Sequence, residues 1–158
     1  MDKIPVTKAG FARLEAEHKN LKSVRRPAII EAIAEARAHG DLSENAEYHA
    51  AKEQQSFIEG RIQELDAVLG RAQVIDPAML SGDTIKFGAT VKIVDEDTDE
   101  EEVWQIVGDY EANTEEGRLS ISAPVARALV GKAVGDSVKV KTPKGVRSYE
   151  ILEVSFKS

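Results

Sequence analysis

The sequence predicts an α+β protein in two domains: an N-terminal antiparallel α-helical hairpin and a C-terminal, mostly antiparallel β domain with one short helix. Three observations lead to this prediction. Residues 1–76 are rich in Ala, Glu, Lys, Arg and Leu, which favour helices. Residues 77–158 are rich in Gly, Val, Ile and Thr, and turn residues recur every few positions. Helical periodicity stops at Asp76-Pro77, which we therefore take as the domain boundary.

Composition narrows the classes of protein to which the chain can belong. Its 158 residues are 42% hydrophobic and 31% charged, which is typical of a globular protein, and the net charge of −7 argues against holding nucleic acid by bulk positive charge. The absence of cysteine excludes disulfides, thiol catalysis and cysteine-ligated metals. No apolar run approaches the roughly 20 residues of a membrane span, and the first residues carry no signal-peptide pattern. We therefore expect a cytoplasmic protein that does not contact the membrane.

A less regular apolar stripe predicts the first helix of the hairpin. Its members are Phe11, Leu14, Leu21, Val24, Ile29, Ile33 and Ala36. The phase of the stripe slips after Pro27, and a proline inside a helix removes one hydrogen bond and clashes with the preceding turn. Because helical periodicity resumes at once, we expect a kink near Pro27 and not the end of the helix.

The connection to the second helix spans residues 39–44 and is short, so the two helices are expected to be antiparallel neighbours. Gly40 suits the left-handed conformation that ends many helices. Asp41 and Glu44 have the spacing of a capping box at the start of the second helix, with Asp41 in the place of the usual Ser or Thr.

A heptad pattern predicts this second helix. Its seam residues recur at alternating intervals of three and four, which keeps one stripe facing a partner helix. They are Tyr48, Ala51, Gln55, Ile58, Ile62, Leu65 and Leu69. The spacing predicts a helix that packs against its neighbour along its whole length, with Gln55 as the single polar member of the seam.

Alternation with a period of two predicts the strands of the second domain. We expect them at residues 90–94, 103–107, 119–121, 137–141 and 146–154, the last two joined by the turn Pro143-Lys144-Gly145. Pro124 at a first helical position and Gly131 after the last one predict a short helix over residues 124–130. The acidic run at residues 95–102 is expected to be a solvated turn between two strands.

Two carboxylates at the end of the hairpin, Asp41 and Glu44, are the strongest candidates for chemistry. One interpretation is helix capping, since residues of these types begin many helices. The other is presentation to a partner. Mg²⁺ prefers one or two carboxylates together with waters and phosphates, so the pair would form an incomplete site that a partner completes. In either case we expect no metal on the free protein.

Basic residues lie near the same end of the hairpin. Arg37 and Lys52 are either ordinary solvated charges or a local basic strip that follows a phosphate backbone. His39 and His49 flank the loop without a third ligand, so a zinc site is not expected. The sequence shows no phosphate-binding loop, nucleophile elbow or Ser/His/Asp arrangement, so we expect a protein that is not itself an enzyme.

The most distinctive run in the sequence is Gly-Asp-Leu-Ser-Glu-Asn-Ala-Glu-Tyr at residues 40–48, within a longer run over residues 34–55. Further distinctive runs lie at residues 21–27, 87–91, 106–108 and 124–132. In these runs, which cover nearly the whole chain, the sequence resembles the GreA/GreB transcript-cleavage factors of bacterial RNA polymerase. The acidic balance of the chain favours the GreA branch of that family.

The resemblance implies an N-terminal coiled coil and a C-terminal FKBP-like domain. It implies that the second domain docks at the rim of the secondary channel of RNA polymerase and that the coiled coil reaches the active site through this channel. Asp41 and Glu44 match the acids at the family's tip, which help to hold a Mg²⁺ ion shared with the polymerase active site and its attacking water. The polymerase then cleaves its own backtracked nascent RNA near the 3′ end.

The resemblance also assigns residues outside the tip acids. Arg37 and Lys52 match the family's basic patch, which contacts the RNA. Ser122, Pro124 and Arg127 are the candidates for docking on the polymerase. Ala123 stands where the family often has Ser before this proline, and we expect Ser122 to take over its role. The free protein is expected to be a monomer.

Two other functions remain open. A regulator that acts only by occupying the channel would need the shape of the hairpin but not its two acids. A prolyl isomerase or a chaperone is suggested by the FKBP-like resemblance. An isomerase pocket needs aromatic walls, however, and the second domain has only Phe87, Trp104, Tyr110, Tyr149 and Phe156.

Overall fold

The computed structural model describes residues 2–40 and 45–157. The chain divides into two compact units, one comprising Met1–Asp2 and Phe11–Ala72 and the other Lys3–Gly10 and Gln73–Ser158. The boundary expected at Asp76-Pro77 lies four residues from the second junction. The segment Lys3–Gly10, however, groups with the C-terminal unit, because its contacts are with residues far along the chain.

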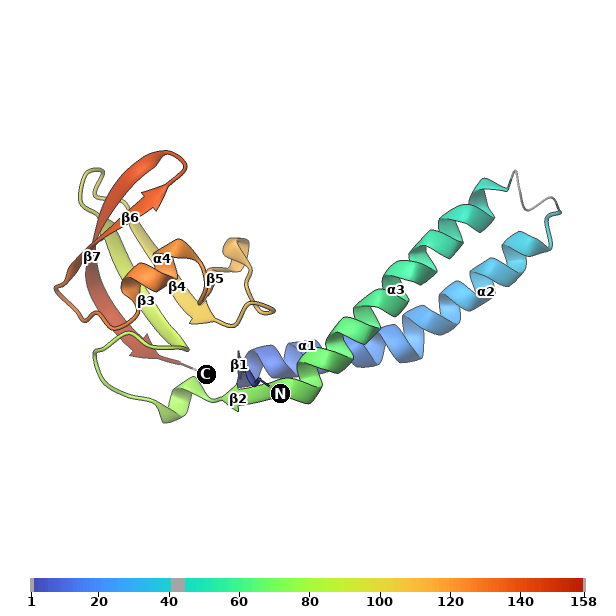
Figure 1. Ribbon diagram of the computed structural model, residues 1–158, viewed down its shortest axis with the longest axis horizontal. Helices are drawn as coiled ribbons and strands as arrows, with labels where there is room; N and C mark the ends of the chain where they lie inside the picture. The colour runs from blue at the N-terminus through green and yellow to red at the C-terminus, as the bar shows by residue number, and fades with distance from the viewer. Residues whose placement is uncertain (1, 41–44, 158) are drawn as a thin grey trace. The chain divides into compact units, whose positions relative to one another are not determined.

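The first unit is a helical hairpin in which α2 and α3 run antiparallel side by side (Figure 1). One arm consists of α1 (Lys8–Asn20), η1 (Leu21–Arg25) and α2 (Arg26–Arg37), and the other is α3 (Ala46–Arg71). The buried residues of α3 are Ala51, Ile58, Ile62, Leu65 and Val68. The heptad prediction is confirmed up to Leu65. Beyond it the buried residue is Val68, while Leu69 is only half-buried.

The first arm contains a π-helical turn, η1, in which the Arg26 N–H donates to the carbonyl of Leu21, five residues earlier. The buried hydrophobic residues of this arm are Leu14, Leu21, Ile29 and Ala36. Their intervals are seven, eight and seven residues. The π turn accommodates the one extra residue, so both halves of the stripe face α3.

This turn bears on two predictions for the first arm. The helical arm continues past Pro27, as expected, and the slip in phase coincides with the extra residue of η1. Pro27 lies in the first turn of α2, where a missing N–H costs little. Val24 was expected in the apolar stripe but is 55% exposed, because η1 turns its side chain away from α3.

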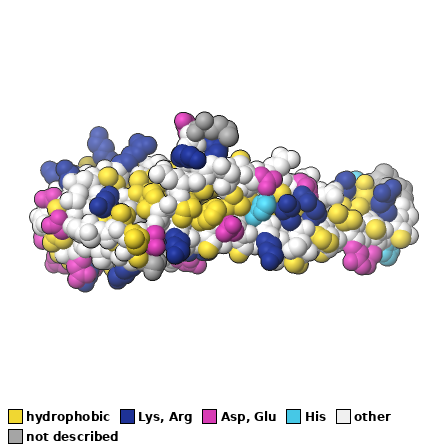
Figure 2. All heavy atoms as spheres, turned by 90° about the horizontal axis from the view of Figure 1, so that it is seen from below, with side chains coloured by type: hydrophobic (Ala, Val, Ile, Leu, Met, Phe, Trp, Pro, Cys, Tyr) yellow, Lys and Arg dark blue, Asp and Glu magenta, His cyan; other side chains and the backbone are white. Residues whose placement is uncertain are grey.

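Two bidentate ion pairs join the arms. Arg26 donates two hydrogen bonds of 2.8 Å to Glu59, and Arg61 donates bonds of 2.7 and 2.8 Å to Glu17. These bonds stabilise the ionised carboxylates and hold the pKa of Glu17 and of Glu59 below the ordinary value of 4.5. Figure 2 shows the pattern that results on its visible face, where Lys and Arg side chains are interspersed with Asp and Glu. Although the chain carries a net negative charge, many of its acidic side chains therefore lie next to basic ones.

The second unit contains a five-stranded sheet with the order β5-β4-β3-β7-β6. Its elements are β3 (Ala89–Asp95), β4 (Glu101–Val107), β5 (Arg118–Ser120), β6 (Ser137–Thr142), β7 (Gly145–Phe156) and α4 (Pro124–Leu129), with short helices η2 (Pro77–Met79) and η3 (Thr114–Glu116). Neighbouring strands are antiparallel except for β4 and β5, which are parallel. The predicted strands and short helix are all confirmed.

The core of this unit forms where the inner face of the sheet meets α4. Alternate residues of β3 are buried, and they pack with buried residues of β4, β6, β7 and α4. The largest fully buried members are Ile85, Ile93, Ile106, Leu129 and Ile151. Trp104, the only tryptophan in the sequence, packs against this core and therefore reports on its integrity.

The acidic run supplies the turn between β3 and β4, as expected, but Asp95 is the last residue of β3, Glu101 and Glu102 begin β4, and Asp95 is not solvated. Asp95 is 6% exposed and accepts hydrogen bonds from the backbone of Asp97 at 2.8 Å and of Thr98 at 3.2 Å. Arg147 donates a further bond of 3.1 Å to it. The backbone bonds and the nearby guanidinium lower the pKa of Asp95, so this carboxylate has a structural role in the turn.

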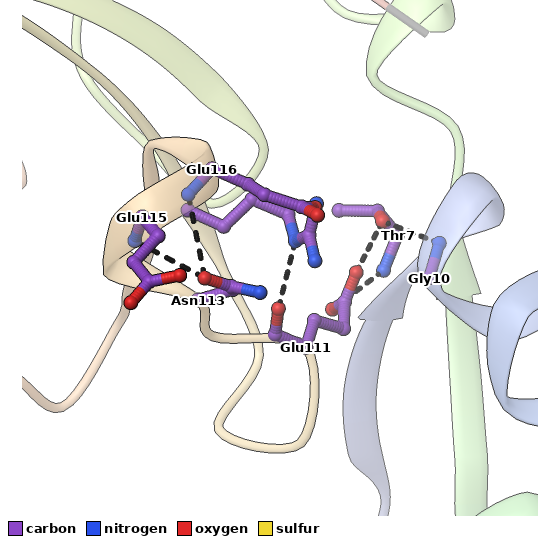
Figure 3. A network of polar contacts seen from close by, with 7 residues as sticks. Thr7, Gly10, Glu111, Asn113, Glu115 and Glu116 are labelled. Carbon is purple, nitrogen blue, oxygen red and sulfur yellow. Dashed lines mark hydrogen bonds and ion pairs between the residues drawn. The ribbon is translucent and has the colours of Figure 1, made fainter.

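The N-terminal segment forms strand β1 (Ile4–Thr7), which pairs with β2 (Ala72–Ile75) and is fastened to Glu111 (Figure 3). The buried Glu111 carboxylate accepts hydrogen bonds from the Thr7 N–H at 3.0 Å, from the Thr7 hydroxyl and from the Gly108 N–H at 2.9 Å. The Thr7 hydroxyl also accepts a 3.0 Å bond from the Gly10 N–H. The sequence indicated neither strand nor this carboxylate, because Thr7 and Glu111 are 104 positions apart.

Candidate functional site

The two acids on which the sequence hypothesis depends, Asp41 and Glu44, lie outside the described residues. The structure does describe the helix ends that flank them. α2 ends at Arg37 and is followed by a turn in which the Gly40 N–H donates a 3.4 Å bond to the carbonyl of Arg37. Gly40 has a φ of +111°, which confirms the predicted left-handed conformation at the end of this helix.

Asn45 is the first described residue after the gap, and its side chain touches both helices. Its Oδ1 accepts a 3.1 Å hydrogen bond from the Tyr48 N–H and so caps the start of α3. Its Nδ2 donates a 2.6 Å bond to the carbonyl of Ala36, in the last turn of α2. One amide thereby satisfies a free N–H of α3 and adds a second donor to the Ala36 carbonyl, which also accepts a 3.2 Å bond from the His39 N–H.

This geometry corrects the capping interpretation of the tip acids. The N-cap of α3 is Asn45, with φ −85° and ψ 97°, and the helix begins at Ala46. Asp41 in the N-cap position would require a helix that starts several residues earlier. The N-cap of the second helix is therefore Asn45 and not one of the two acids.

Arg37 and Lys52 come from different helices and line the same hollow near this end of the hairpin. The hollow has a volume of about 310 Å³, and its other lining residues are Ile30, Ile33, Ala34 and Gln55. Both basic side chains are exposed, and the Lys52 ammonium donates a 3.3 Å bond to Gln55. The hollow thus combines two cations with an apolar floor, to which the 52% exposed Ile30 contributes.

The histidines show no sign of a metal site. His39 and His49 are exposed, and His49 makes an edge-to-face contact with Tyr48. Over residues 2–40 and 45–157, no cluster of three or more His, Asp or Glu side chains is arranged to hold a metal ion. Within the same ranges, no helix is long and apolar enough to cross a membrane.

The three docking candidates of the second unit lie together around the start of α4. Ser122, Pro124 and Arg127 are all exposed, and Pro124 occupies the first turn of the helix. Ser122 does not cap α4, contrary to expectation, because the N-cap Ala123 position has no side-chain hydrogen bond and the Ser122 hydroxyl donates to Asp109 instead. Asp109 is therefore part of the same surface.

Asp109 organises this surface. The Ser120 hydroxyl donates a 2.5 Å bond to Asp109 Oδ1, which also accepts from the Ser122 hydroxyl. These two bonds, with a smaller contribution from the charge of Arg127, lower the pKa of Asp109 below its ordinary value of 3.8. At neutral pH the surface thus presents an ionised carboxylate beside a guanidinium.

Sequence reasoning missed Asn45, Asp109 and Glu111. Asn45 stands inside the most distinctive run and has the residue type of an N-cap, so its role was detectable. Asp109 and Ser120 are separated by eleven positions on different elements, and no local pattern connects them.

Comparison with known proteins was decisive for the identity of the family. Residues 4–74 match the family model for the transcription elongation factor N-terminal domain, and residues 80–156 match the model for the GreA/GreB transcription elongation factor C-terminal domain. The chain is 69% identical over 156 residues to the transcription elongation factor GreA of Ruegeria pomeroyi and 67% identical to that of Azorhizobium caulinodans. Each alignment covers 99% of both chains.

Solved structures with similar chains were also found. The structure of the transcription factor Gfh1 aligns over 98% of this chain and 99% of that chain, with a TM-score of 0.47 and 29% identity. A GreA/GreB elongation factor from Nitrosomonas europaea aligns over 98% of this chain and 100% of that chain, with a TM-score of 0.43 and 26% identity.

Proposed function

Because the chain belongs to the GreA/GreB family of transcription elongation factors, we propose that it rescues backtracked or arrested bacterial RNA polymerase by stimulating the polymerase's own cleavage of the nascent RNA. The polymerase is the enzyme in this proposal, and the chain is a non-catalytic partner. It acts as a monomer in the cytoplasm and inserts the end of its hairpin through the secondary channel.

The observation that carries the proposal is the hollow lined by Arg37 and Lys52, which come from the two helices that residues 41–44 connect in the sequence. Cations on the two helices suit the phosphate backbone of a displaced RNA 3′ end, and the apolar floor suits its uncharged parts. Within the described residues no group of three or more His, Asp or Glu side chains could hold a metal ion.

Asp41 and Glu44 supply what the hollow lacks. Two carboxylates from one chain are fewer ligands than Mg²⁺ requires, so this donor set fits an ion held jointly with the polymerase active site. When bound there, the ion would supply an activated water for hydrolysis of the phosphodiester. The contribution of this chain is to bring the two carboxylates to the reacting bond and to hold the RNA beside them.

The surface at the start of α4 is the docking site in this proposal. Ser122, Pro124 and Arg127 are exposed, and Asp109 adds an ionised acceptor beside them. A preorganised surface of this kind fits a polar interface on the rim of the channel. Docking through the second unit leaves the hairpin free to enter the channel.

The experiment compares the wild-type chain with a double variant, Asp41→Ala with Glu44→Ala, on backtracked elongation complexes that carry end-labelled RNA. We expect the double variant to lose stimulated cleavage by 100-fold or more, on the order of a group that acts only in the transition state, while its affinity for polymerase changes less than about threefold. Release of the short 3′ fragment and competition for polymerase binding are measured separately.

A matched control removes two exposed acids from the same hairpin, Glu31→Ala with Glu53→Ala, and is expected to cleave like the wild type. A double variant at the tip that still stimulated cleavage would refute the role of the acids. If it instead kept its full effect on transcription while the wild type released no RNA fragment, the chain would act by occupying the channel.

A further inference from the structure

A second hollow lies on the face of the hairpin opposite to the hollow of Arg37 and Lys52. Successive residues of a helix turn by about 100°, so Ala28 and Ile30 point to opposite sides of the buried Ile29. Ile30 lines the first hollow and Ala28 lines the second, so the two hollows flank the packed seam on opposite faces. The second hollow has a volume of about 240 Å³, and its lining residues are Arg25, Ala28, Ile29, Ala32, Gln54 and Ile58.

Phe57 belongs to the same face as this second hollow. It is three positions from Gln54, and helical residues at this spacing lie on one side of the helix. Phe57 is 71% exposed, whereas Phe11 and Tyr48, the other aromatic residues of the hairpin, are half-buried. An aromatic ring that stays in water forgoes the favourable free energy of burial. A partner that covered this face would recover it.

Arg25 brings a charge to this hollow that has no counterpart in the hairpin. The arginines Arg26 and Arg61 each donate two hydrogen bonds to a glutamate of the opposite arm. Arg25 is exposed, and within the part of the chain that the structure describes its guanidinium has neither a hydrogen bond nor an ion pair. A carboxylate from outside the chain can therefore form the bidentate pair that Arg25 lacks.

The composition of this face favours a protein partner over a nucleic acid. Protein interfaces are enriched in aromatic residues and arginine, and their anchor side chains commonly enter apolar pockets. Four of the six residues that line the second hollow are apolar, and Arg25 is its single cation. The hollow on the opposite face holds two cations, Arg37 and Lys52, which suits a phosphate backbone better.

We propose that Phe57, Arg25 and the hollow beside them form a protein-docking face of the hairpin, which contacts the wall of the polymerase channel. An apolar side chain of the wall fills the hollow and covers Phe57, and a carboxylate of the wall pairs with Arg25. This inference rests on the proposed function, because it takes the polymerase as the partner. The hairpin thus meets protein on this face and RNA on the opposite one.

The experiment measures the affinity of the full-length chain for core polymerase without RNA and for elongation complexes with backtracked RNA. The test variant is Phe57→Ala with Arg25→Gln. Both positions are exposed and both new residues are good helix formers, so the variant is expected to fold. The matched control, Val24→Ala with Lys22→Gln, also removes one exposed apolar side chain and one exposed cation from the hairpin. Competition with labelled wild-type chain gives each affinity.

We expect the test variant to bind both forms of the polymerase about tenfold more weakly than the wild type, since a covered aromatic ring and a paired arginine are typical anchors of an interface. The rate of RNA cleavage at saturating factor is expected to stay within about twofold of the wild-type rate, because the lost contacts are with protein and not with the reacting RNA. The control variant should match the wild type in affinity, and all three chains should have similar helical melting temperatures by circular dichroism.

Several results would overturn the inference. If the test variant bound core polymerase as tightly as the wild type, this face would not dock on protein, and a loss confined to complexes with backtracked RNA would assign it to RNA. An equal loss in the control variant would show that the effect is not specific to this face. If the wild-type chain sedimented as a dimer and the test variant as a monomer, the occupant would be a second copy of the chain.

The proposed function can fail separately from this inference. Affinity for core polymerase is measured without RNA cleavage. If the wild-type chain binds the polymerase but stimulates no cleavage, the proposed function is wrong, and the comparison of affinities still decides whether this face docks on protein.

Discussion

The side chain of Thr7 makes two hydrogen bonds, and one of them attaches the N-terminal segment to the rest of the second unit. The hydroxyl donates to Glu111 and accepts from the Gly10 N–H, and the backbone N–H of the same residue also donates to Glu111. Thr7 is 1% exposed, so water cannot replace these partners. The space around the carboxylate is small, because a Cβ at Gly10 would lie 1.8 Å from Glu111 Oε1.

We predict that Thr7→Val lowers the free energy of unfolding of the second unit by about 2 kcal/mol. Valine has nearly the shape of threonine, so the loss reflects the hydrogen bond to a charged, buried group. Urea unfolding followed by the fluorescence of Trp104 measures it, since this residue packs on the core of that unit. Thr114→Val, on the exposed side of η3, should change the same transition by less than about 0.5 kcal/mol. If the two variants unfolded with the same free energy, the hydrogen bonds of Thr7 would not stabilise the second unit and the prediction would be wrong.

At the scale of the element, the first arm shows that an irregular helix can follow from one inserted residue. The seam of this arm advances by seven, eight and seven residues, and the interval of eight coincides with the π turn η1. The Ser23 hydroxyl donates a 2.6 Å hydrogen bond to the carbonyl of Lys19, so a side chain of this turn also bonds to the backbone four residues earlier. Pro27 follows the turn and is tolerated there.

We predict that Pro27→Ala changes the stability of the hairpin by less than about 1 kcal/mol. A proline in an uninterrupted helix costs about 3 kcal/mol relative to alanine, but Pro27 lies in the first turn of α2, where most of that cost is absent. Thermal unfolding followed by circular dichroism at 222 nm measures the change. A gain near 3 kcal/mol would show that the proline, and not the extra residue, causes the irregularity.

At the scale of the whole molecule, both units depend on carboxylates that are ionised in the folded state. Bonds to arginine lower the pKa of Glu17 and Glu59 in the hairpin, and backbone bonds lower the pKa of Asp95 in the second unit. A carboxyl whose pKa is lower in the folded than in the unfolded chain stabilises the fold above its unfolded value. That stabilisation is lost as the pH falls through the unfolded value toward the folded one.

We therefore predict that these carboxylates stabilise both units by a constant amount near neutral pH. Below about pH 4.5 the free energy of unfolding should fall as the groups become protonated. Urea unfolding between pH 7 and pH 3 measures this, with circular dichroism for the hairpin and Trp104 fluorescence for the second unit. Glu59→Gln should reduce the pH dependence of the helical transition and leave that of the fluorescence transition unchanged. If the free energy of unfolding of the hairpin depended on pH in the same way in the wild type and the variant, the Arg26–Glu59 pair would not contribute to this pH dependence.

Local patterns in the amino-acid sequence were enough to predict the elements of this protein, their order and the position of the connection between the two helical arms. Helices and strands were predictable because periods of 3.6 and 2 are local properties, and Gly40 and Pro124 mark helix ends through their own backbone preferences. The distinctive run at residues 40–48 was likewise visible without a structure, and it led to the correct family.

The tertiary structure alone decided which distant residues hold these elements together. It placed β1 on the C-terminal unit through Glu111, gathered Asp109 with Ser120 and Ser122, and resolved the slip of the first arm as a π turn. Hydrogen bonds and burial between residues far apart in the chain leave no periodic trace in the sequence. The dual contact of Asn45 lies between these cases: its residue type predicts a cap, but only the packed pair of helices shows that the same amide also reaches Ala36.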